Sequence, residues 1–380
     1  MDRIILLRDN VKEIIISANS YLQYKNTLYL VTQGYRKYPI TILTPNHDLF
    51  RFFSVINEKV FNGEITLIYF DNFQPDPRRK TARDLSKIFY ILRDIIRERR
   101  YLKDTFKKYL AGITGSDFFF FGRGSTCFFL VKSLVGRNRA VYLSSYPIAA
   151  APKQYAPTNI AELTRLIILK LTFGWGIALG KVAHVNGVPH IPDWFLKKKV
   201  DRVIGEEERD EMLKGFELDQ FKVFDTAKYS AMYLDDNLIN SGHILDKDTF
   251  RKEIGEVVGI LTKYFPSNEI ARKYHPDYSS DRTVIEVGDI LPDFIPAELL
   301  YHDKVKLYLG DSTTAIANVE KGLAISILNL ISFKNAEIRE QLKEVLIRMS
   351  RSKLLFPRTL GEFEEILISL FSNKKENSDQ

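Results

Sequence analysis

The feature that most constrains the fold of this chain is an alternation of short β-rich runs with helical stretches. In the first half, β-branched and aromatic residues gather in short runs that are separated by amphipathic segments. We expect strands at residues 27–32, 40–43, 65–70, 117–121 and 140–143. Because strands that alternate with helices are usually joined by crossovers, this order predicts an α/β fold with a doubly wound parallel sheet.

The same pattern restarts after a polar, charged stretch at residues 197–219. We expect strands at residues 231–234, 305–309 and 323–327, and a further strand that leads into residues 273–276. Helices are expected at 247–264, from about 312, at 336–351 and at 360–371. A chain of 380 residues is also too long for one ordinary core. We therefore predict a Rossmann-like domain at 1–218, a second at 219–335, and helices with a disordered polar tail at 336–380.

Cysteine usage and the N-terminus give expectations about the compartment. The single cysteine, Cys127, excludes an intramolecular disulfide framework and a cysteine-rich zinc site. The sequence that follows Met1 has no long apolar stretch ending in a small-residue cleavage site. A cytoplasmic protein is expected, with possible peripheral contact at the inner face of the cell membrane.

Three short motifs in the second half combine groups that suit a phosphate. The motifs are Lys273-Tyr274-His275-Pro276, Ile295-Pro296-Ala297-Glu298 and Gly310-Asp311-Ser312-Thr313-Thr314. An imidazole near neutrality donates a hydrogen bond or a proton to a departing phosphate oxygen. Hydroxyls at a helix N-terminus, together with unpaired backbone N–H groups, form an anion site. The simpler interpretations are a histidine packed beside a proline turn and an ordinary Ser/Thr N-cap.

A glycine-containing turn marks a further candidate in the first half. The strand predicted at 117–121 runs directly into Gly122-Arg123-Gly124-Ser125. Glycines there let the backbone approach a ligand at the carboxyl end of the sheet. A plain strand-to-helix turn is the alternative.

The ordered series of an acidic pair, Lys-x-His-Pro, Ile-Pro-x-Glu and Gly-x-Ser/Thr-Ser/Thr resembles the bacterial sialyltransferases of the lipooligosaccharide and polysialic-acid type. The resemblance covers mainly residues 231–328, and the first half agrees only in its strand rhythm. It implies a GT-B fold, in which two Rossmann-like domains face a central cleft. It also implies inverting transfer of sialic acid, or a related nonulosonate, from a CMP-sugar to a glycan or glycolipid acceptor.

The resemblance also implies roles for individual residues. His275 looks like the histidine that contacts the phosphate of CMP-sialic acid, and Glu298 like a residue that hydrogen-bonds ribose hydroxyls. One carboxylate of Asp235 and Asp236 is then the general base. The remaining nucleotide-sugar contacts are implied for Lys273, Pro276, Gly310, Ser312, Thr313, Thr314, Gly122, Gly124 and Ser125.

The acidic pair departs from the family pattern in two ways. Asn237 follows it where the family has glycine, although asparagine tolerates the left-handed conformation. In polysialyltransferases the pair lies in the first domain, whereas here it opens the second. Asp117 and Asp193 are therefore alternative bases.

We expect neither a metal nor another cofactor, because only one phosphate must be neutralised as CMP departs.

Three alternatives to a sialyltransferase function stay open. One is another GT-B transferase, of the Kdo or CDP-glycerol type, since Lys-x-His-Pro also resembles teichoic-acid polymerases. A second is a non-catalytic glycan- or nucleotide-binding protein. A third is a nucleic-acid binder, which only the pI near 9.1 and a basic helix at residues 78–108 support. The sequence has no recognised nucleic-acid-binding motif, so no nucleic-acid partner is expected.

A basic amphipathic helix is expected at residues 78–108, where twelve Lys or Arg stand against four Asp or Glu. It is either a surface helix with a solvated outer face or a helix whose outer face binds anionic lipid headgroups or an anionic polymer.

An apolar stretch at residues 163–179 is interrupted by Arg165 and Lys170. Its uninterrupted part is shorter than the ~20 residues of a membrane span, so a buried helix is expected, with an interfacial helix as the alternative.

Overall fold

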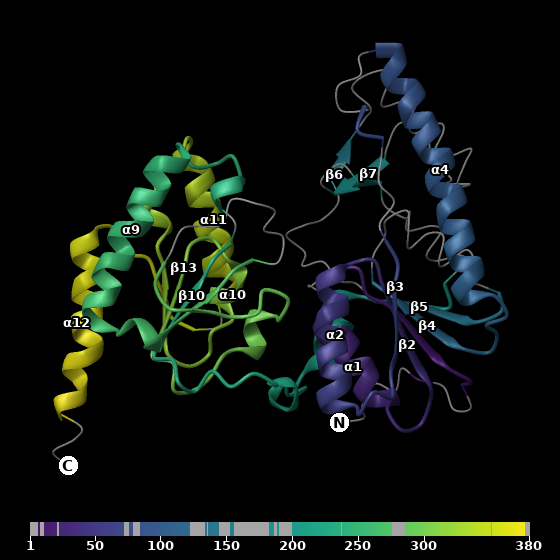
Figure 1. The fold of residues 1–380 in the computed structure, drawn as a ribbon, viewed down its shortest axis with the longest axis horizontal. Helices are drawn as coiled ribbons and strands as arrows, with labels where there is room; N and C mark the ends of the chain where they lie inside the picture. Colours follow the sequence, from purple (N-terminus) through teal and green to yellow (C-terminus); the bar gives the residue numbers. More distant parts are fainter. Residues whose placement is uncertain are drawn as a thin grey trace. The chain divides into compact units, whose positions relative to one another are not determined.

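The computed structural model describes residues 7, 11–20, 23–71, 76–78, 84–121, 134, 136–143, 153–155, 182–185, 188–189, 200–236, 238–275, 286–350 and 352–376. The chain divides into two compact units, Met1–Glu217 and Leu218–Gln380. Each unit carries its own six-stranded parallel sheet (Figure 1).

The sheet of unit 1 has the strand order of a Rossmann fold. Its strands are β1 (Ile14–Ser17), β2 (Ile40–Thr44), β3 (Thr66–Tyr69), β4 (Asp117–Phe120), β5 (Arg139–Leu143) and β9 (Arg202–Ile204). They pair in parallel in the order β3-β2-β1-β4-β5-β9. The order reverses between β1 and β4, which is where such sheets bind ligands at their carboxyl ends.

The helices of unit 1 are α1 (Tyr24–Gly34), α2 (His47–Val60), α4 (Asp84–Leu110) and α8 (Glu206–Leu213). The amphipathic helix α4 packs Ile95, Leu102 and Phe106 into one core cluster with Phe118 and Phe120 of β4. A small antiparallel sheet is formed by β6 (Lys153–Tyr155), β7 (Val182–Val185) and β8 (Val188–Pro189). The other strands predicted for this half, at 40–43, 65–70, 117–121 and 140–143, are confirmed.

The strand predicted at residues 27–32 is wrong, because this segment lies inside α1. Every residue from Asn26 to Val31 is buried, so the helix has no polar face in this segment to reveal its 3.6-residue period. Its Thr, Tyr and Val residues then favoured a strand by local propensity. The first strand of the sheet is instead β1, a fully buried Ile-Ile-Ile-Ser run.

The sheet of unit 2 repeats the order of unit 1. Its strands are β10 (Ala231–Leu234), β11 (Ile270–Lys273), β12 (Asp289–Ile290), β13 (Leu307–Gly310), β14 (Leu323–Ser326) and β15 (Leu354–Leu355). They pair in parallel in the order β12-β11-β10-β13-β14-β15. The strands predicted for this half are all confirmed.

The main helices of unit 2 are α9 (Lys247–Tyr264), α10 (Thr314–Ala317), α11 (Ala336–Met349) and α12 (Leu360–Glu376). Single 3-10 turns lie at η3 (Asp219–Phe221), η4 (Leu238–Asn240), η5 (Ser267–Glu269), η6 (Ala297–Leu299) and η7 (Leu328–Leu330). Helix α9 begins as predicted, because the Asp246 carboxylate accepts hydrogen bonds from the backbone N–H groups of Asp248 and Thr249.

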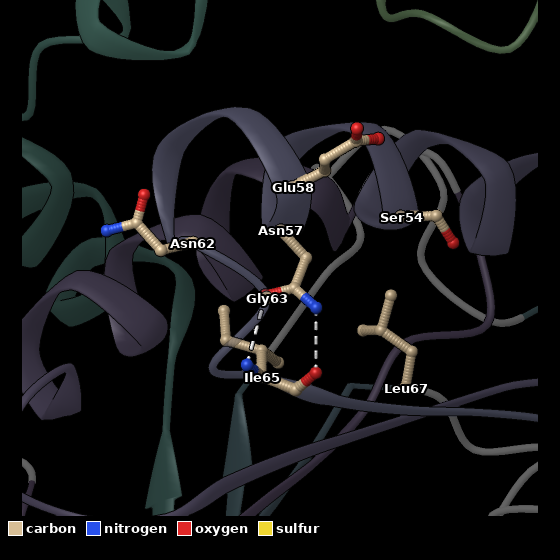
Figure 2. A pocket seen from close by; sticks show the side chains of 7 residues that line it. All are labelled: Ser54, Asn57, Glu58, Asn62, Gly63, Ile65 and Leu67. Carbon is tan, nitrogen blue, oxygen red and sulfur yellow. Dashed lines mark hydrogen bonds between the residues drawn. The ribbon is translucent and has the colours of Figure 1, made fainter.

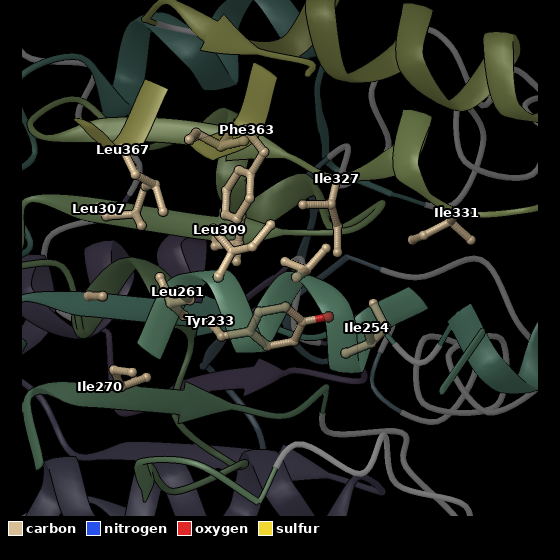
Figure 3. Close-up of a cluster of buried hydrophobic side chains, with 14 of the residues drawn as sticks. Tyr233, Ile254, Leu261, Ile270, Leu307, Leu309, Ile327, Ile331, Phe363 and Leu367 are labelled. Atoms are coloured by element: carbon tan, nitrogen blue, oxygen red, sulfur yellow. The ribbon is translucent and has the colours of Figure 1, made fainter. Parts of the chain in front are cut away.

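The core of unit 2 joins its sheet to α9 and α12. Tyr233 and Leu309, from neighbouring strands, cluster with Ile254 of α9 and with Phe363 and Leu367 of α12 (Figure 3). The C-terminal helix therefore packs on the same core as the sheet. Two Rossmann-like doubly wound sheets in succession confirm the predicted α/β class with the domain types of a GT-B fold.

Two sequence predictions concern membranes. Among the residues that the structure describes, no helix is both long and apolar enough to cross a membrane. The apolar stretch at 163–179 lies outside the described residues.

Candidate functional site

The candidate site lies where the strand order of unit 2 reverses, at the carboxyl ends of β10 and β13. The last residues of these strands, Leu234 and Gly310, are paired in register. Asp235 and Asp236 follow the first strand, and Asp311 and Ser312 follow the second. The topology thus joins the predicted acidic pair to the predicted hydroxyl motif, although the two are far apart in the sequence.

Asp236 and Ser312 are in direct contact across this edge. The Ser312 hydroxyl donates a hydrogen bond of 2.6 Å to Oδ2 of Asp236. Burial raises the pKa of Asp236 above its ordinary value, while the Ser312 hydrogen bond and the nearby positive charge of His275 act in the opposite direction. A carboxylate whose pKa moves towards neutrality is a better proton acceptor than an exposed aspartate.

His275 reaches the same edge from the other neighbour of β10. It lies two residues beyond the end of β11, is half-buried, and is close enough for its charge to act on Asp236. The structure therefore brings together His275, Asp236 and Ser312 from three adjacent strands. Their arrangement places a carboxylate and an imidazole at the same strand ends.

Asp311 belongs to this cluster and was not predicted as a site residue. Its side chain is fully buried, and Oδ1 accepts a hydrogen bond of 2.7 Å from the backbone N–H of Ser312. Burial first, and then the negative charges of Asp235 and Asp236, raise the pKa of Asp311 well above its ordinary value. Within the described part of the chain, its Oδ2 has no hydrogen-bond partner. The sequence signal that could have identified Asp311 as a site residue is its position directly after Gly310, the glycine that ends β13.

Asp235 and Lys273 make hydrogen bonds that fix the backbone at the ends of β10 and β11. The N–H of Asp235 donates to the carbonyl of Lys273 at 2.9 Å, which continues the β10–β11 ladder. The buried Lys273 ammonium donates to the carbonyls of Tyr274 at 2.7 Å and Asp293 at 2.8 Å. This lysine ties the end of β11, and hence His275, to the loop that follows β12.

Gly310 and Thr313 shape the turn after β13. A Cβ atom on Gly310 would lie 3.1 Å from the Leu234 carbonyl oxygen and 3.0 Å from the Thr313 methyl, so only glycine fits without a shift. Thr313 is the N-cap of α10, since its hydroxyl accepts from the N–H of Ala315 at 3.3 Å. The helix expected near Ser312 is only four residues long, so the ordinary N-cap interpretation accounts for Thr313. Thr314 is exposed.

Glu298 lies in η6, half-buried, and accepts a hydrogen bond of 3.2 Å from the side-chain amide of Asn318. Asn318 directly follows α10, so Glu298 is tied to the turn that Thr313 begins. The structure shows a structural contact for this residue, and its predicted contact with a ribose stays a prediction.

The candidates of unit 1 do not join a site in the described residues. Asp117 is the first residue of β4, pairs in register with Ile14, and forms an ion pair of 3.1 Å with Arg139. It therefore lies at the amino end of the sheet, at the opposite end of β4 from Phe120. The other candidates of unit 1, Gly122, Gly124, Ser125 and Asp193, lie outside the described residues, as does Pro276 of unit 2.

A shallow hollow in unit 1 lies between the end of α2 and the start of β3 (Figure 2). It is lined by Ser54, Asn57, Glu58, Asn62, Gly63, Ile65 and Leu67. The Asn57 amide donates to the carbonyl of Ile65 at 2.8 Å and accepts from its N–H at 3.0 Å. Its central amide is thus occupied in holding β3, and none of the predicted site residues lines it.

In the ranges that the structure describes, no group of three or more His, Cys, Asp or Glu side chains is arranged to hold a metal ion.

No protein-family model and no curated protein matches this chain. Among solved structures, the calicheamicin glycosyltransferase CalG4 is 11% identical with a TM-score of 0.45, over 95% of this chain and 90% of its own. UDP-GlcNAc 2-epimerase from Neisseria meningitidis, bound to UDP-GlcNAc, is 10% identical with a TM-score of 0.33, over 95% and 100%.

MurG from Acinetobacter baumannii is 12% identical with a TM-score of 0.28, over 96% of this chain and 91% of its own. Likeness at this level does not identify a substrate. The fold assignment rests on the two six-stranded sheets and their strand orders.

Proposed function

We propose that this protein is a glycosyltransferase that binds its nucleotide-sugar donor at the carboxyl edge of the unit 2 sheet. The observation that carries the proposal is the convergence of Asp236, Ser312 and His275 at the switch point of that sheet. Ligands of open α/β sheets bind at such points. A base and a cationic donor side by side are the groups that glycosyl transfer requires.

The donor that fits the motif series is a CMP-linked sialic acid or a related nonulosonate. In this proposal His275 donates to the phosphate, and the Ser312 hydroxyl and Thr314 offer further donors. A nucleoside monophosphate carries one phosphate, so a single imidazolium offsets much of its charge and no metal ion is required.

The proposed reaction is an inverting displacement. Asp236 removes the proton of an acceptor hydroxyl, the hydroxyl oxygen bonds to the anomeric carbon, and the bond from that carbon to the phosphate oxygen breaks. The bonding electrons leave with CMP, whose growing negative charge is stabilised by His275. The proton stays on Asp236 until water or the leaving phosphate accepts it.

One observation favours a second candidate. Asp235, Asp236 and Asp311 crowd three carboxyl groups at the strand ends, and ionised carboxylates repel a phosphate while they accept hydrogen bonds from sugar hydroxyls. A protein that binds a nucleoside or a sugar there without transferring it would keep the same cluster. A Kdo transferase would use the same displacement at an anomeric carbon with another sugar, whereas a CDP-glycerol transferase would move a glycerol phosphate by attack of the acceptor hydroxyl on phosphorus, with CMP as the leaving group.

A thermal-shift panel with CMP-, CDP- and UDP-linked donors, CMP and cytidine tests these alternatives. A ligand that binds only the folded state raises the melting temperature by mass action. We expect CMP-sialic acid and CMP to raise it more than cytidine. If cytidine acts as strongly as CMP, the phosphate is not recognised and the binding-protein alternative gains support.

Release of CMP from CMP-sialic acid, with and without a glycan acceptor, separates a transferase from a binder. We expect slow release with donor alone and faster release with acceptor. Absence of release in both cases, while CMP still raises the melting temperature, would contradict a sialyltransferase function.

A further inference from the structure

Helix α4 exposes two large apolar side chains on its outer side. Phe89 is 61% exposed and Ile96 is 54% exposed. They are seven residues apart, which is about two helical turns, so both point to the same side of the helix. The core-facing residues of α4, among them Leu102 and Phe106, lie on the opposite side. Neither exposed side chain therefore contributes to the core of unit 1.

Basic side chains surround these two residues on the same side. Arg93, Arg100, Lys103 and Lys107 are exposed and fall within the same arc of the helix as Phe89 and Ile96. We refer to these six residues as the basic–apolar face of α4. Over its whole length, α4 carries eight Lys or Arg and four Asp or Glu, so its net charge is positive.

The nearby carboxylates neutralise only part of this charge. Asp76 lies 2.7 Å from Arg78 and 3.9 Å from Arg93, and buried Asp94 lies 3.7 Å from Arg97. The hydrogen bond from the Arg78 guanidinium lowers the pKa of Asp76 to about 2, so this carboxylate stays ionised.

Further along the helix, Arg100, Lys103 and Lys107 have no carboxylate within ion-pair distance in the described residues. These three cations of the face therefore remain available to an anionic partner.

We propose that the basic–apolar face of α4 docks on the surface of a membrane that contains anionic phospholipids. Phe89 and Ile96 enter the boundary between headgroups and acyl chains, while Arg93, Arg100, Lys103 and Lys107 contact the phosphates. Helices that combine apolar anchors with Lys and Arg bind membrane surfaces in this way. The proposal does not depend on the proposed transferase function.

The two apolar residues are the reason to choose a lipid surface over a soluble polyanion. A charged polymer in water attracts lysine and arginine side chains but offers no apolar phase for a phenylalanine and an isoleucine. A membrane surface satisfies both kinds of side chain at once. Loss of binding on removal of the apolar pair is therefore the distinguishing result.

Vesicle co-sedimentation of the full chain tests the proposal. We expect binding to vesicles of phosphatidylcholine mixed with phosphatidylglycerol, and little binding to phosphatidylcholine alone. Arg100→Gln with Lys103→Gln and Lys107→Gln should weaken binding about 100-fold, since each basic residue near an anionic surface contributes roughly a fivefold factor. Added salt should weaken wild-type binding, because the attraction is screened within about 8 Å at physiological ionic strength.

A second variant, Phe89→Ser with Ile96→Ser, should weaken binding at least about tenfold at unchanged charge. The matched controls lie in unit 2. Leu245→Ser with Ile347→Ser removes two apolar side chains that are 50% and 54% exposed, and Lys252→Gln with Lys304→Gln and Lys353→Gln removes three exposed charges. Both controls should bind as the wild type does, and circular dichroism should show that every variant is folded.

Equal binding by wild type and both α4 variants would overturn the proposal. So would binding that survives the Phe89 and Ile96 changes, fails on the charge change and is displaced by soluble polyphosphate, because that pattern identifies a polyanion surface.

Discussion

The hydrogen bond of 2.6 Å from the Ser312 hydroxyl to the Asp236 carboxylate joins the ends of two adjacent strands, β10 and β13. Each side chain follows a strand by two residues, so the contact is a direct consequence of the parallel register of these strands. The same register places Asp311 beside them. The candidate site is therefore built by sheet topology, and its geometry depends on how closely β10 and β13 approach.

The first prediction concerns Ser312→Ala. Its hydroxyl favours the ionised form of Asp236, so its removal should raise the pKa of that carboxyl further. If Asp236 acts as the base in its ionised form, activity should then be lost at a higher pH as the solution is acidified. The acidic limb of the pH–rate profile checks this. Thr262→Ala, which removes an exposed hydroxyl on α9, should leave the profile unchanged. An unmoved acidic limb in Ser312→Ala would remove Asp236 from the role of base.

The second prediction concerns His275→Ala. Loss of a donor to the leaving phosphate should slow transfer about 100-fold or more while the fold persists. The rate of CMP release in the presence of acceptor measures the effect. The exposed His243 of the same unit provides the matched control, His243→Ala, which should keep its activity. Near-normal turnover by His275→Ala would show that this histidine has no part in the reaction.

Helices were predicted correctly from the sequence where one face of the helix is buried and the other is exposed to solvent. In α9 the buried residues Phe250, Ile254, Val257 and Leu261 recur at helical spacing, and the helix predicted at 247–264 is confirmed at both ends. In α1 burial on all sides removed that periodicity, and a strand was predicted at 27–32. The difference lies in the environment of the two helices.

The candidate site was predicted as a series of motifs that together hold one phosphate, but the direct contact between Asp236 and Ser312 was not predicted. Asp236 and Ser312 were both singled out from the sequence, yet only the strand order of the sheet shows that they touch. Asp311 stood within one of these motifs but was not predicted as a site residue, because its raised pKa comes from burial and from charges that are distant in the sequence. The predicted roles of the acidic pair, of Glu298 and of Thr314 stay predictions.

The third prediction concerns Gly310→Ala. The new Cβ would meet the Leu234 carbonyl oxygen at 3.1 Å and force β13 away from β10. Strain of this kind in a packed site costs about 1–3 kcal/mol of unfolding free energy. Gly255→Ala in α9 is the matched control, because no atom lies within 4 Å of its added Cβ. That change should stabilise the protein by up to about 1 kcal/mol through helix propensity. Equal stability of the two variants in urea unfolding would contradict a close approach at Gly310.

The last prediction uses the raised pKa of Asp311. A carboxyl group whose pKa is raised by folding binds its proton more tightly in the folded state. Its unfavourable effect on stability is therefore absent below the ordinary carboxyl pKa of about 4 and grows as the pH rises towards the folded-state value. Asp311→Asn, which removes the charge, should then raise the melting temperature at pH 8, and the gain should shrink as the pH falls.

Asp289 provides a comparison, because its pKa is shifted in the opposite direction from that of Asp311. Hydrogen bonds from Lys228 and Tyr229 lower its pKa, so its ionised form stabilises the folded protein above the ordinary carboxyl pKa and loses that effect as the pH falls. Asp289→Asn should therefore lower the melting temperature at pH 8, where Asp311→Asn raises it. Melting curves of both variants between pH 4 and pH 8 compare the two signs directly. A lower melting temperature for Asp311→Asn at pH 8 would show that its carboxylate is stabilised in the folded protein, contrary to the effect expected from its burial and from the charges of Asp235 and Asp236.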